Sequence, residues 1–269
     1  MDARRARSTR RSPVRPNGQH FLKSSRLAAE LVDRAGISST DRVLEIGAGT
    51  GRLTEALASR AGRVIAVELD PRLAARLRAR FGERPDVTIF EGDALDVLLP
   101  RAPFRAFGNI PFGITTALLR RLLDDPRPSM TGADLIVQWE VVRKRTASPP
   151  RNVLSLAWGP WWSFRAGPRI PSRCFEPPPR ADGGVLSIRR RDGPVLPERD
   201  RRPYRALIRR AFLRAGEPLP SALRHTLTAG QVRRLANDLA FPEGARPVDL
   251  GVEQWAGLYL FIRRARGER

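Results

Sequence analysis

The stretch Val-Leu-Glu-Ile-Gly-Ala-Gly-Thr-Gly at positions 43–51 decides the fold. Its mostly apolar first four residues predict a short buried strand, and the alternating glycines predict a tight loop that leads into a helix. A strand, a glycine loop and a helix form the first unit of a Rossmann-like sheet, which binds ligands at the carboxyl ends of its strands. The stretch therefore predicts a nucleoside-bearing cofactor at Gly47 and Gly49.

The spacing of the glycines separates two kinds of cofactor. The dinucleotide fingerprint GxGxxG needs a third glycine where this chain has Arg52, because that glycine lets the helix pack closely on the strand. A GxGxG loop after an acidic strand suits S-adenosyl-L-methionine, whose methionine part has no pyrophosphate and can lie against the backbone. We therefore expect S-adenosyl-L-methionine, with an NAD-dependent dehydrogenase as the alternative.

The first 190 residues alternate between strand and helix patterns, which predicts parallel βαβ units in a doubly wound sheet. Strands are expected at 43–46, 64–68, 87–90, 104–109 and 133–137. Helices are expected at 24–36, 53–60, 71–81 and 115–123. Two further runs, 153–164 and 184–188, are expected to complete the sheet as antiparallel edge strands.

Two acidic residues stand at the ends of predicted strands. Glu68 ends the second strand, and its carboxylate can accept hydrogen bonds from both ribose hydroxyls of the cofactor. Asp93 follows the third strand, where it can accept from the adenine N6 while the Ala94 backbone N–H serves a ring nitrogen. The alternatives are a surface acid for Glu68 and an Asx turn or helix cap for Asp93. We expect all three residues to bind the cofactor.

The tetrapeptide Asn-Ile-Pro-Phe at 109–112 closes another apolar run at the same edge of the sheet. The Asn109 side-chain oxygen and a nearby backbone carbonyl can accept both hydrogens of an amine attached to an aromatic ring. Such an amine is a poor nucleophile because its lone pair is delocalised, and the two acceptors localise that lone pair for attack on a methyl sulfonium. Phe112 can stack on the base and tolerate its positive charge. Asn109, Pro111 and Phe112 are therefore candidate catalytic residues, with a plain turn as the alternative.

Composition limits the partners. The 269 residues, 41% of them hydrophobic, suffice for one large domain and a small one, and the net charge of +21, almost wholly from arginine, attracts polyanions. A membrane surface is not favoured, because no apolar run approaches the length of a spanning helix. Cys174 is the only cysteine and the two histidines are far apart, so we expect neither a disulfide nor a metal site. Without the apolar core of a secretory signal, the protein is expected to be cytoplasmic.

The composition changes at both ends of the α/β part. Residues 1–16 contain six arginines and almost no apolar side chain, so they are expected to form a disordered arm that either grips phosphates or is merely solvated. Beyond residue 190 only helical patterns occur, around 204–212 and at 219–228, 230–240 and 252–264. We predict a catalytic domain at 17–190 and a small helical domain for rRNA binding at 191–269.

Separate motifs in this order and spacing resemble the rRNA adenine N6-methyltransferases. They are Gln-His-Phe-Leu at 19–22, the glycine loop, Glu68, Asp-Ala at 93–94 with the Asn109 loop, and Phe-Glu-Pro-Pro-Pro at 175–179. The resemblance is closer to the Erm branch, which confers macrolide resistance, than to the KsgA-type small-subunit dimethylases. It implies a seven-stranded S-adenosylmethionine-dependent methyltransferase domain, N6-methylation of an adenine in 23S rRNA, and resistance to macrolides, lincosamides and streptogramin B.

The resemblance also assigns roles to residues outside the loops already named. His20, in place of the family's commoner Asn, and Leu22 are implied to line the methionine end of the cofactor. Phe175 is implied to hold its ring against the target base opposite Phe112, because the following prolines stiffen its loop. A loop aromatic that plugs the seam between domains is the alternative for Phe175. Asp182 matches the family's acid after this loop.

The target side is expected to bind RNA largely by shape. An adenine within a duplex cannot reach such a pocket, so we expect an unpaired or flipped adenine in precursor or free 23S rRNA, bound by a monomer. The cationic loop 143–145 is expected to contact phosphates, and the aromatic cluster at 158–164 is expected to be mostly core.

Two rival functions stay open: a KsgA-type dimethyltransferase for 16S rRNA, and a non-catalytic RNA-binding assembly or transcription factor on the same fold. The intact Asn109 group argues against the second rival.

Overall fold

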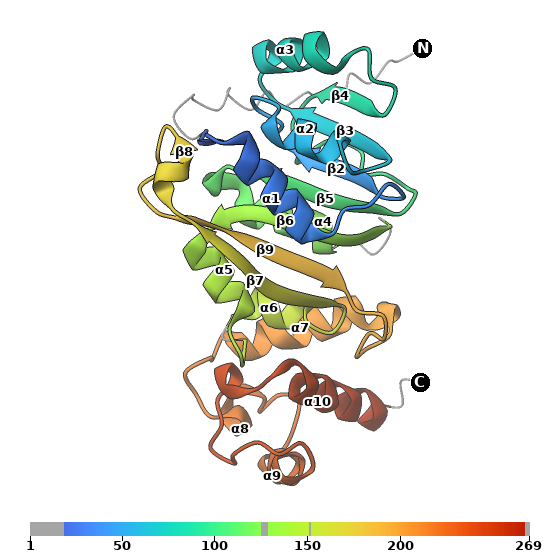
Figure 1. Cartoon of the computed structure of the whole chain (residues 1–269). Helices are drawn as coiled ribbons and strands as arrows, with labels where there is room; N and C mark the ends of the chain where they lie inside the picture. The colour runs from blue at the N-terminus through green and yellow to red at the C-terminus, as the bar shows by residue number, and fades with distance from the viewer. Residues whose placement is uncertain (1–18, 125–128, 151, 267–269) are drawn as a thin grey trace, which may run out of the picture.

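The computed structural model describes residues 19–124, 129–150 and 152–266 (Figure 1). The predicted arm at 1–16 lies outside these residues. In the view of Figure 1 a twisted sheet with helices on both faces occupies the upper part, and α8, α9 and α10 lie below it. Across the described ranges no helix combines the length and the apolar character needed to cross a membrane.

The central sheet has seven strands in the order β4-β3-β2-β5-β6-β9-β7. Neighbouring strands from β4 to β6 pair in parallel, whereas β9 pairs antiparallel with both β6 and β7. Their bounds are β2 (Arg42–Ile46), β3 (Arg63–Glu68), β4 (Val87–Glu91), β5 (Phe104–Asn109), β6 (Met130–Gln138), β7 (Trp162–Ile170) and β9 (Gly183–Arg190). The predicted seven-stranded α/β fold is confirmed.

One detail of the predicted sheet is wrong. The run 184–188 does form an antiparallel strand, but this strand, β9, lies between β6 and β7 and not at an edge. Because β9 is antiparallel to both of its neighbours, the edge strand β7 runs in the same direction as β6. The carboxyl end of β7 therefore joins those of β5 and β6 at one edge of the sheet.

Helices cover both faces of the sheet. On one face lie α1 (Ser25–Ala35), α2 (Arg52–Ala58) and α3 (Pro71–Phe81), and on the other lie α4 (Thr115–Asp124), α5 (Trp139–Thr146) and α6 (Val153–Trp158). Each set buries its apolar side chains in a separate core cluster. This two-sided burial explains why the parallel strands read as continuous apolar runs.

Local sequence signals fix the ends of these helices. The Ser24 hydroxyl accepts a hydrogen bond from the Leu27 backbone N–H at 3.2 Å, and Gly36 ends α1 with a φ of 64°. Asp70 caps α3 in the same way, with its carboxylate 2.8 Å from the Arg72 nitrogen and Pro71 in the first turn. These caps are why the predicted helix bounds at 24–36 and 71–81 hold.

The run 153–164 was predicted as one strand, and this is wrong. Asn152 accepts a hydrogen bond from the Ser155 backbone N–H at 2.9 Å and starts α6, and the strand begins only at Trp162. A continuous apolar run has no period that separates a buried helix from a buried strand, so the cap decides. As predicted, the tryptophans of this run are core: Trp158, Trp161 and Trp162 are at most 3% exposed.

The loop predicted at 143–145 is also wrong, because these residues lie in the last turns of α5. The side chains of Arg143 and Lys144 are exposed, whereas Arg145 is partly buried against the Trp158 ring.

The C-terminal region is helical, as predicted. It contains α7 (Arg201–Phe212), α8 (Leu219–Ala222), α9 (Ala229–Asp238) and α10 (Val252–Ala265), with short 3-10 turns at Glu198–Asp200 and Pro247–Asp249. The core is continuous from α6 into α7, where the Tyr204 hydroxyl donates to the Leu156 carbonyl at 3.2 Å. The domain boundary at 190 and 191 stays a prediction, and the structure adds that α7 packs directly on the catalytic layer.

Candidate active site

The glycine loop begins where β2 ends and turns with three glycines in the left-handed region. Their φ angles are 73° for Gly47, 56° for Gly49 and 80° for Gly51. A Cβ built at Gly49 would stand 2.7 Å from the Phe21 ring, whereas one at Gly47 would meet only the Asn109 backbone oxygen, at 3.5 Å, among the described residues. Gly49 is therefore needed for packing, and the Gly47 backbone is open toward Asn109.

Glu68 ties this loop to the end of β3. One carboxylate oxygen accepts from the Gly49 N–H at 2.7 Å and the other from the Asp70 N–H at 2.9 Å, and the residue is 3% exposed. Each oxygen has a second lone pair, so both can still accept a hydroxyl. Glu68 is no surface acid, and its backbone carbonyl also accepts from Gly92, which brings the next loop beside it.

Asp93 and Ala94 lie in that next loop, just after β4. The Asp93 Oδ1 accepts from the Leu95 N–H at 2.8 Å, an Asx turn that fixes the loop. No described residue donates to its second oxygen, and Asp93 is half-buried. The turn and the cofactor contact thus use different oxygens of one carboxylate and do not exclude each other.

Asn109 ends β5 beside the glycine loop, and its amide is oriented. The Nδ2 group donates to the His20 carbonyl at 2.5 Å. Since a carbonyl can only accept, this bond fixes which end of the amide is which and leaves Oδ1 as the acceptor that faces away from His20. The oxygen that the sequence assigned to the target amine is therefore not used by this hydrogen bond.

Pro111 and Phe112 follow in a short 3-10 turn, Phe112–Ile114, that leads into α4. The Ile110 N–H donates to the Ile136 carbonyl at 2.9 Å, which anchors the turn to β6. The half-buried Phe112 ring lies 6.0 Å from the His20 ring. His20 in turn donates from Nδ1 to the Pro177 carbonyl, 2.7 Å away.

A two-stranded ribbon closes this end of the site. Its strands β1 (Phe21–Leu22) and β8 (Phe175–Glu176) pair antiparallel, and the Lys23 N–H donates to the Cys174 carbonyl. The ribbon carries His20 to Asn109 and Phe112, and it buries Leu22 in the core.

Phe175 corrects the sequence-based interpretation. Its ring is 1% exposed and packs so closely on β9 that a Cβ at Gly183 would stand 2.9 Å from it. It is thus a packing residue behind the ribbon and not a ring open to a base, because the missing side chain of Gly183 makes room for it. Only Phe112, of the two predicted stacking rings, is accessible at this edge.

Glu45 belongs to the sequence motif at 43–51, but no role was predicted for it. It is fully buried, and within the described residues only weak hydrogen bonds from Thr54 reach its carboxyl group. Burial is the main cause that raises its pKa from 4.5 to about 7; the Glu68 charge adds to this rise, and the Thr54 hydrogen bonds oppose it. Its signal was an acid inside an otherwise apolar strand, directly below the glycine loop.

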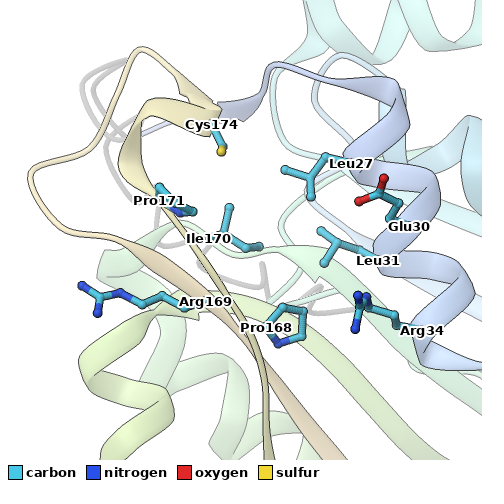
Figure 2. Close-up of a pocket in the computed structure, with 9 residues that line it drawn as sticks. All are labelled: Leu27, Glu30, Leu31, Arg34, Pro168, Arg169, Ile170, Pro171 and Cys174. Atoms are coloured by element: carbon cyan, nitrogen blue, oxygen red, sulfur yellow. The ribbon is translucent and has the colours of Figure 1, made fainter.

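Two cavities lie outside the group of predicted site residues. One, of about 120 Å³, lies between α1 and β7 (Figure 2). Its lining residues are Leu27, Glu30, Leu31, Arg34, Pro168, Arg169, Ile170, Pro171 and Cys174. The other, of about 180 Å³, lies between α7 and α10. Neither contains a predicted site residue. Within the described ranges no cluster of three or more His, Cys, Asp or Glu residues could hold a metal ion.

The structure thus brings His20, Gly47, Glu68 and Asn109 together at the carboxyl edge of the sheet, with the Asp93 loop next to Glu68. A single reversed strand, a glycine loop without a third spaced glycine, and an acid at the end of the second strand define an α/β methyltransferase.

Comparison with known proteins identifies the family. The family model described as ribosomal RNA adenine dimethylase matches residues 15–263. The mycinamicin-resistance protein MyrB of Micromonospora griseorubida is 36% identical over 246 residues, which cover 91% of this chain and 78% of MyrB. The ribosomal RNA small subunit methyltransferase A of Rubrobacter xylanophilus is 36% identical over 258 residues, 92% of this chain and 94% of that protein.

A solved structure agrees with these relatives. The crystal structure of the 23S rRNA methyltransferase ErmE matches with a TM-score of 0.80 and 29% identity, over 90% of this chain and 99% of ErmE. The chain belongs to the ribosomal RNA adenine dimethylase family, and it is an rRNA adenine N6-methyltransferase.

Proposed function

We propose that the protein transfers a methyl group from S-adenosyl-L-methionine to N6 of an adenine in 23S rRNA, and that this confers macrolide, lincosamide and streptogramin B resistance. The observation that carries the chemistry is the oriented Asn109 amide, whose donor end is bound to the His20 carbonyl. The relatives MyrB and ErmE support the large-subunit target and the resistance.

The residues present fit the cofactor. The open Gly47 backbone, the second lone pairs of the Glu68 carboxylate and the second oxygen of Asp93 form a row of polar groups along the edge. Glu68 would bind the ribose hydroxyls, Asp93 and Ala94 the adenine, and Gly47, Gly49, His20 and Leu22 the methionine end. Bound there, S-adenosyl-L-methionine supplies a methyl group on a positively charged sulfur.

The target amine would be oriented from the other side. The Asn109 Oδ1 and a nearby backbone carbonyl accept its two hydrogens, which localises the nitrogen lone pair toward the methyl group. Phe112 stacks on the base and tolerates the charge that develops on it. No side chain is needed as a strong base, because the methylated amine is acidic enough to lose its proton to water.

Such a pocket takes an adenine only when the base is out of the stack, so we infer an unpaired or flipped adenine in free or precursor rRNA. The protein would act in the cytoplasm as a monomer. The exposed cations of α5, Arg143 and Lys144, would contact phosphates near the edge.

A small-subunit target is the second candidate, because the methyltransferase from Rubrobacter is as similar in sequence as MyrB. Primer extension on both large rRNAs from cells that express the protein separates the two. A stop at an adenine of 23S rRNA, together with raised macrolide tolerance, is expected. The Asn109→Ala variant is the control and should give neither. A stop in 16S rRNA alone would overturn the proposed target.

A further inference from the structure

A second planar group lies at the catalytic edge, outside the residues assigned so far. Trp139 starts α5 directly after β6, and Arg169 stands next to the end of β7. The Arg169 guanidinium carbon lies 5.9 Å from the centre of the Trp139 ring, which is a cation–π contact. Arg169 points away from α1 and its neighbouring cavity (Figure 2).

Asp182 holds both members of this pair. Its carboxylate accepts a hydrogen bond from Arg169 Nε at 2.9 Å and forms an ion pair with Nη2 of the same guanidinium at 2.8 Å, and it also accepts from the Ser172 N–H at 2.8 Å. Its backbone carbonyl accepts from the Trp139 N–H at 2.9 Å. The Ser172 amide and Arg169 keep the pKa of Asp182 below its usual range, so the ion pair persists at neutral pH.

The Trp139 ring is also held in place. A Cβ at Gly184 would stand 2.4 Å from the Trp139 ring, so the indole lies directly on the backbone of β9. Two nitrogens of Arg169 therefore lie against the Asp182 carboxylate, and one face of the guanidinium lies toward Trp139. Its side chain is still 60% exposed, which leaves the third nitrogen and the outer face toward solvent.

The strand register places this pair beside the catalytic amide. Asn109 pairs with Ile136 of β6, and at the end of β6 Gln138 pairs with Gly183, which in turn pairs with Ile170. The ends of β5, β6 and β7 are thus on one edge, and three strand spacings separate β5 from β7, about 14 Å. A nucleotide near the bound target base in the RNA strand can therefore reach the pair.

The charge around the pair fits RNA. Arg143 and Arg173 are exposed near it and make no ion pair among the described residues, whereas the nearby Glu140 is paired with Lys144. A guanidinium paired with a carboxylate and placed over an indole is already oriented, so it offers a flat cationic surface at little further entropic cost. Nucleobases of unpaired RNA stack on such planes.

We infer that Arg169, placed over the Trp139 ring and held by Asp182, is a docking point for an unpaired nucleotide that flanks the target adenine. The flanking base stacks on the outer face of the guanidinium, and its phosphate accepts from the free nitrogen. The inference rests on the proposed function, and it makes Arg169 a positioning residue that sets which RNA loops are methylated.

The test measures methylation of an RNA stem-loop whose loop holds an adenine that the wild-type protein methylates. Arg169→Ala should raise the KM for this RNA about tenfold or more, while kcat stays within about twofold. Arg169→Lys keeps the charge and an ion pair with Asp182 but loses the plane, so it should remain nearly as impaired as the alanine variant. Arg165→Ala removes an arginine from the same strand at a distance from the edge and should change KM less than about twofold.

An abasic scan of the loop supplies the decisive comparison. Removing the base at one flanking position should weaken the wild type by a part of the Arg169→Ala loss, because the abasic nucleotide keeps its phosphate, and should cost that variant nothing more, because the base contact is already gone. Losses that multiply at every position, or full rescue by lysine, would overturn the inference and leave Arg169 as a structural clasp or a simple phosphate contact. Absence of methylation of any rRNA by the wild type would instead overturn the proposed function.

Discussion

The cofactor half and the target half of the catalytic edge use different chemical groups. On the cofactor half, carboxylates bind backbone N–H groups: Glu68 holds Gly49, and Asp93 holds its own loop. On the target half, an oriented amide, an aromatic ring and a guanidinium placed over an indole present flat or directional surfaces. The cofactor half is thus held by its own hydrogen bonds, and under the proposed function the target half would offer planes to a base that has left its helix.

If the halves are separable, Asn109→Ala should lower kcat about 100-fold or more and leave cofactor affinity within a few-fold, because one oriented group in a dry site contributes about 2.7–4 kcal/mol. Tritium transfer to rRNA and titration with S-adenosylhomocysteine measure the two quantities. Asn109→Asp should be as inactive, since a carboxylate cannot donate to the His20 carbonyl. Retention of more than about a tenth of the wild-type rate would break the division.

Glu45 tests how the cofactor half is supported. Its pKa rises from 4.5 to about 7 on folding, so its neutral form stabilises the fold. That stability is fully present below about pH 4.5 and is lost as the pH rises through about 7, on the order of 3 kcal/mol in all. Glu45→Gln stays neutral, so the variant should gain on the wild type over this range. Urea unfolding at pH 5 and pH 8 measures this difference in the free energy of unfolding. The same pH dependence for the variant and the wild type would show that the carboxyl is solvated.

The close packing of the glycine loop predicts a smaller effect on stability. Gly49→Ala must keep a positive φ and move the Phe21 ring, so it should lower the free energy of unfolding by about 1–3 kcal/mol. Gly193→Ala, where a Cβ meets nothing within 4 Å, should stay within about 0.5 kcal/mol. Equal effects in a denaturation experiment would show that the loop tolerates a side chain.

Single acids on the cofactor half should have the smallest effects. Glu68→Ala and Asp93→Ala should each weaken cofactor binding roughly tenfold, about 1.4 kcal/mol, through one lost charge-assisted hydrogen bond. Asp96→Ala removes the same charge from an exposed position of the Asp93 loop and is the matched control. Calorimetric titration that shows equal losses for Asp93 and Asp96 would reduce the role of Asp93 to net charge.

The cofactor half was predictable from sequence because its signals are local. Gly47, Glu68 and Asp93 each stand where a strand ends, and parallel strands end at one edge, so their meeting follows from the pattern alone. Asn109 was predictable for the same reason. The orientation of its amide was not, since the partner carbonyl belongs to His20, far away in the chain.

The target half depends on contacts that no local pattern carries. The local sequence at Phe175 is typical of a ring that stacks on a base, but the absent side chain of Gly183 lets this ring pack into the core. The Trp139–Arg169 pair joins α5 and β7 through Asp182, which lies just before β9. The run at 153–164 was assigned to a strand because its apolar residues have no clear period. Tertiary packing decides each of these cases.

The β1–β8 ribbon has a consequence for when the enzyme becomes competent during synthesis. The Asn109 amide is oriented by His20, and His20 is held by β8 and by the Pro177 carbonyl. A nascent chain that has already made the glycine loop, Glu68, Asp93 and Asn109 still lacks the second strand of the ribbon. Methyl transfer should therefore begin only after residue 177 has left the ribosome, so a shorter nascent chain should not modify the rRNA of the ribosome that is making it.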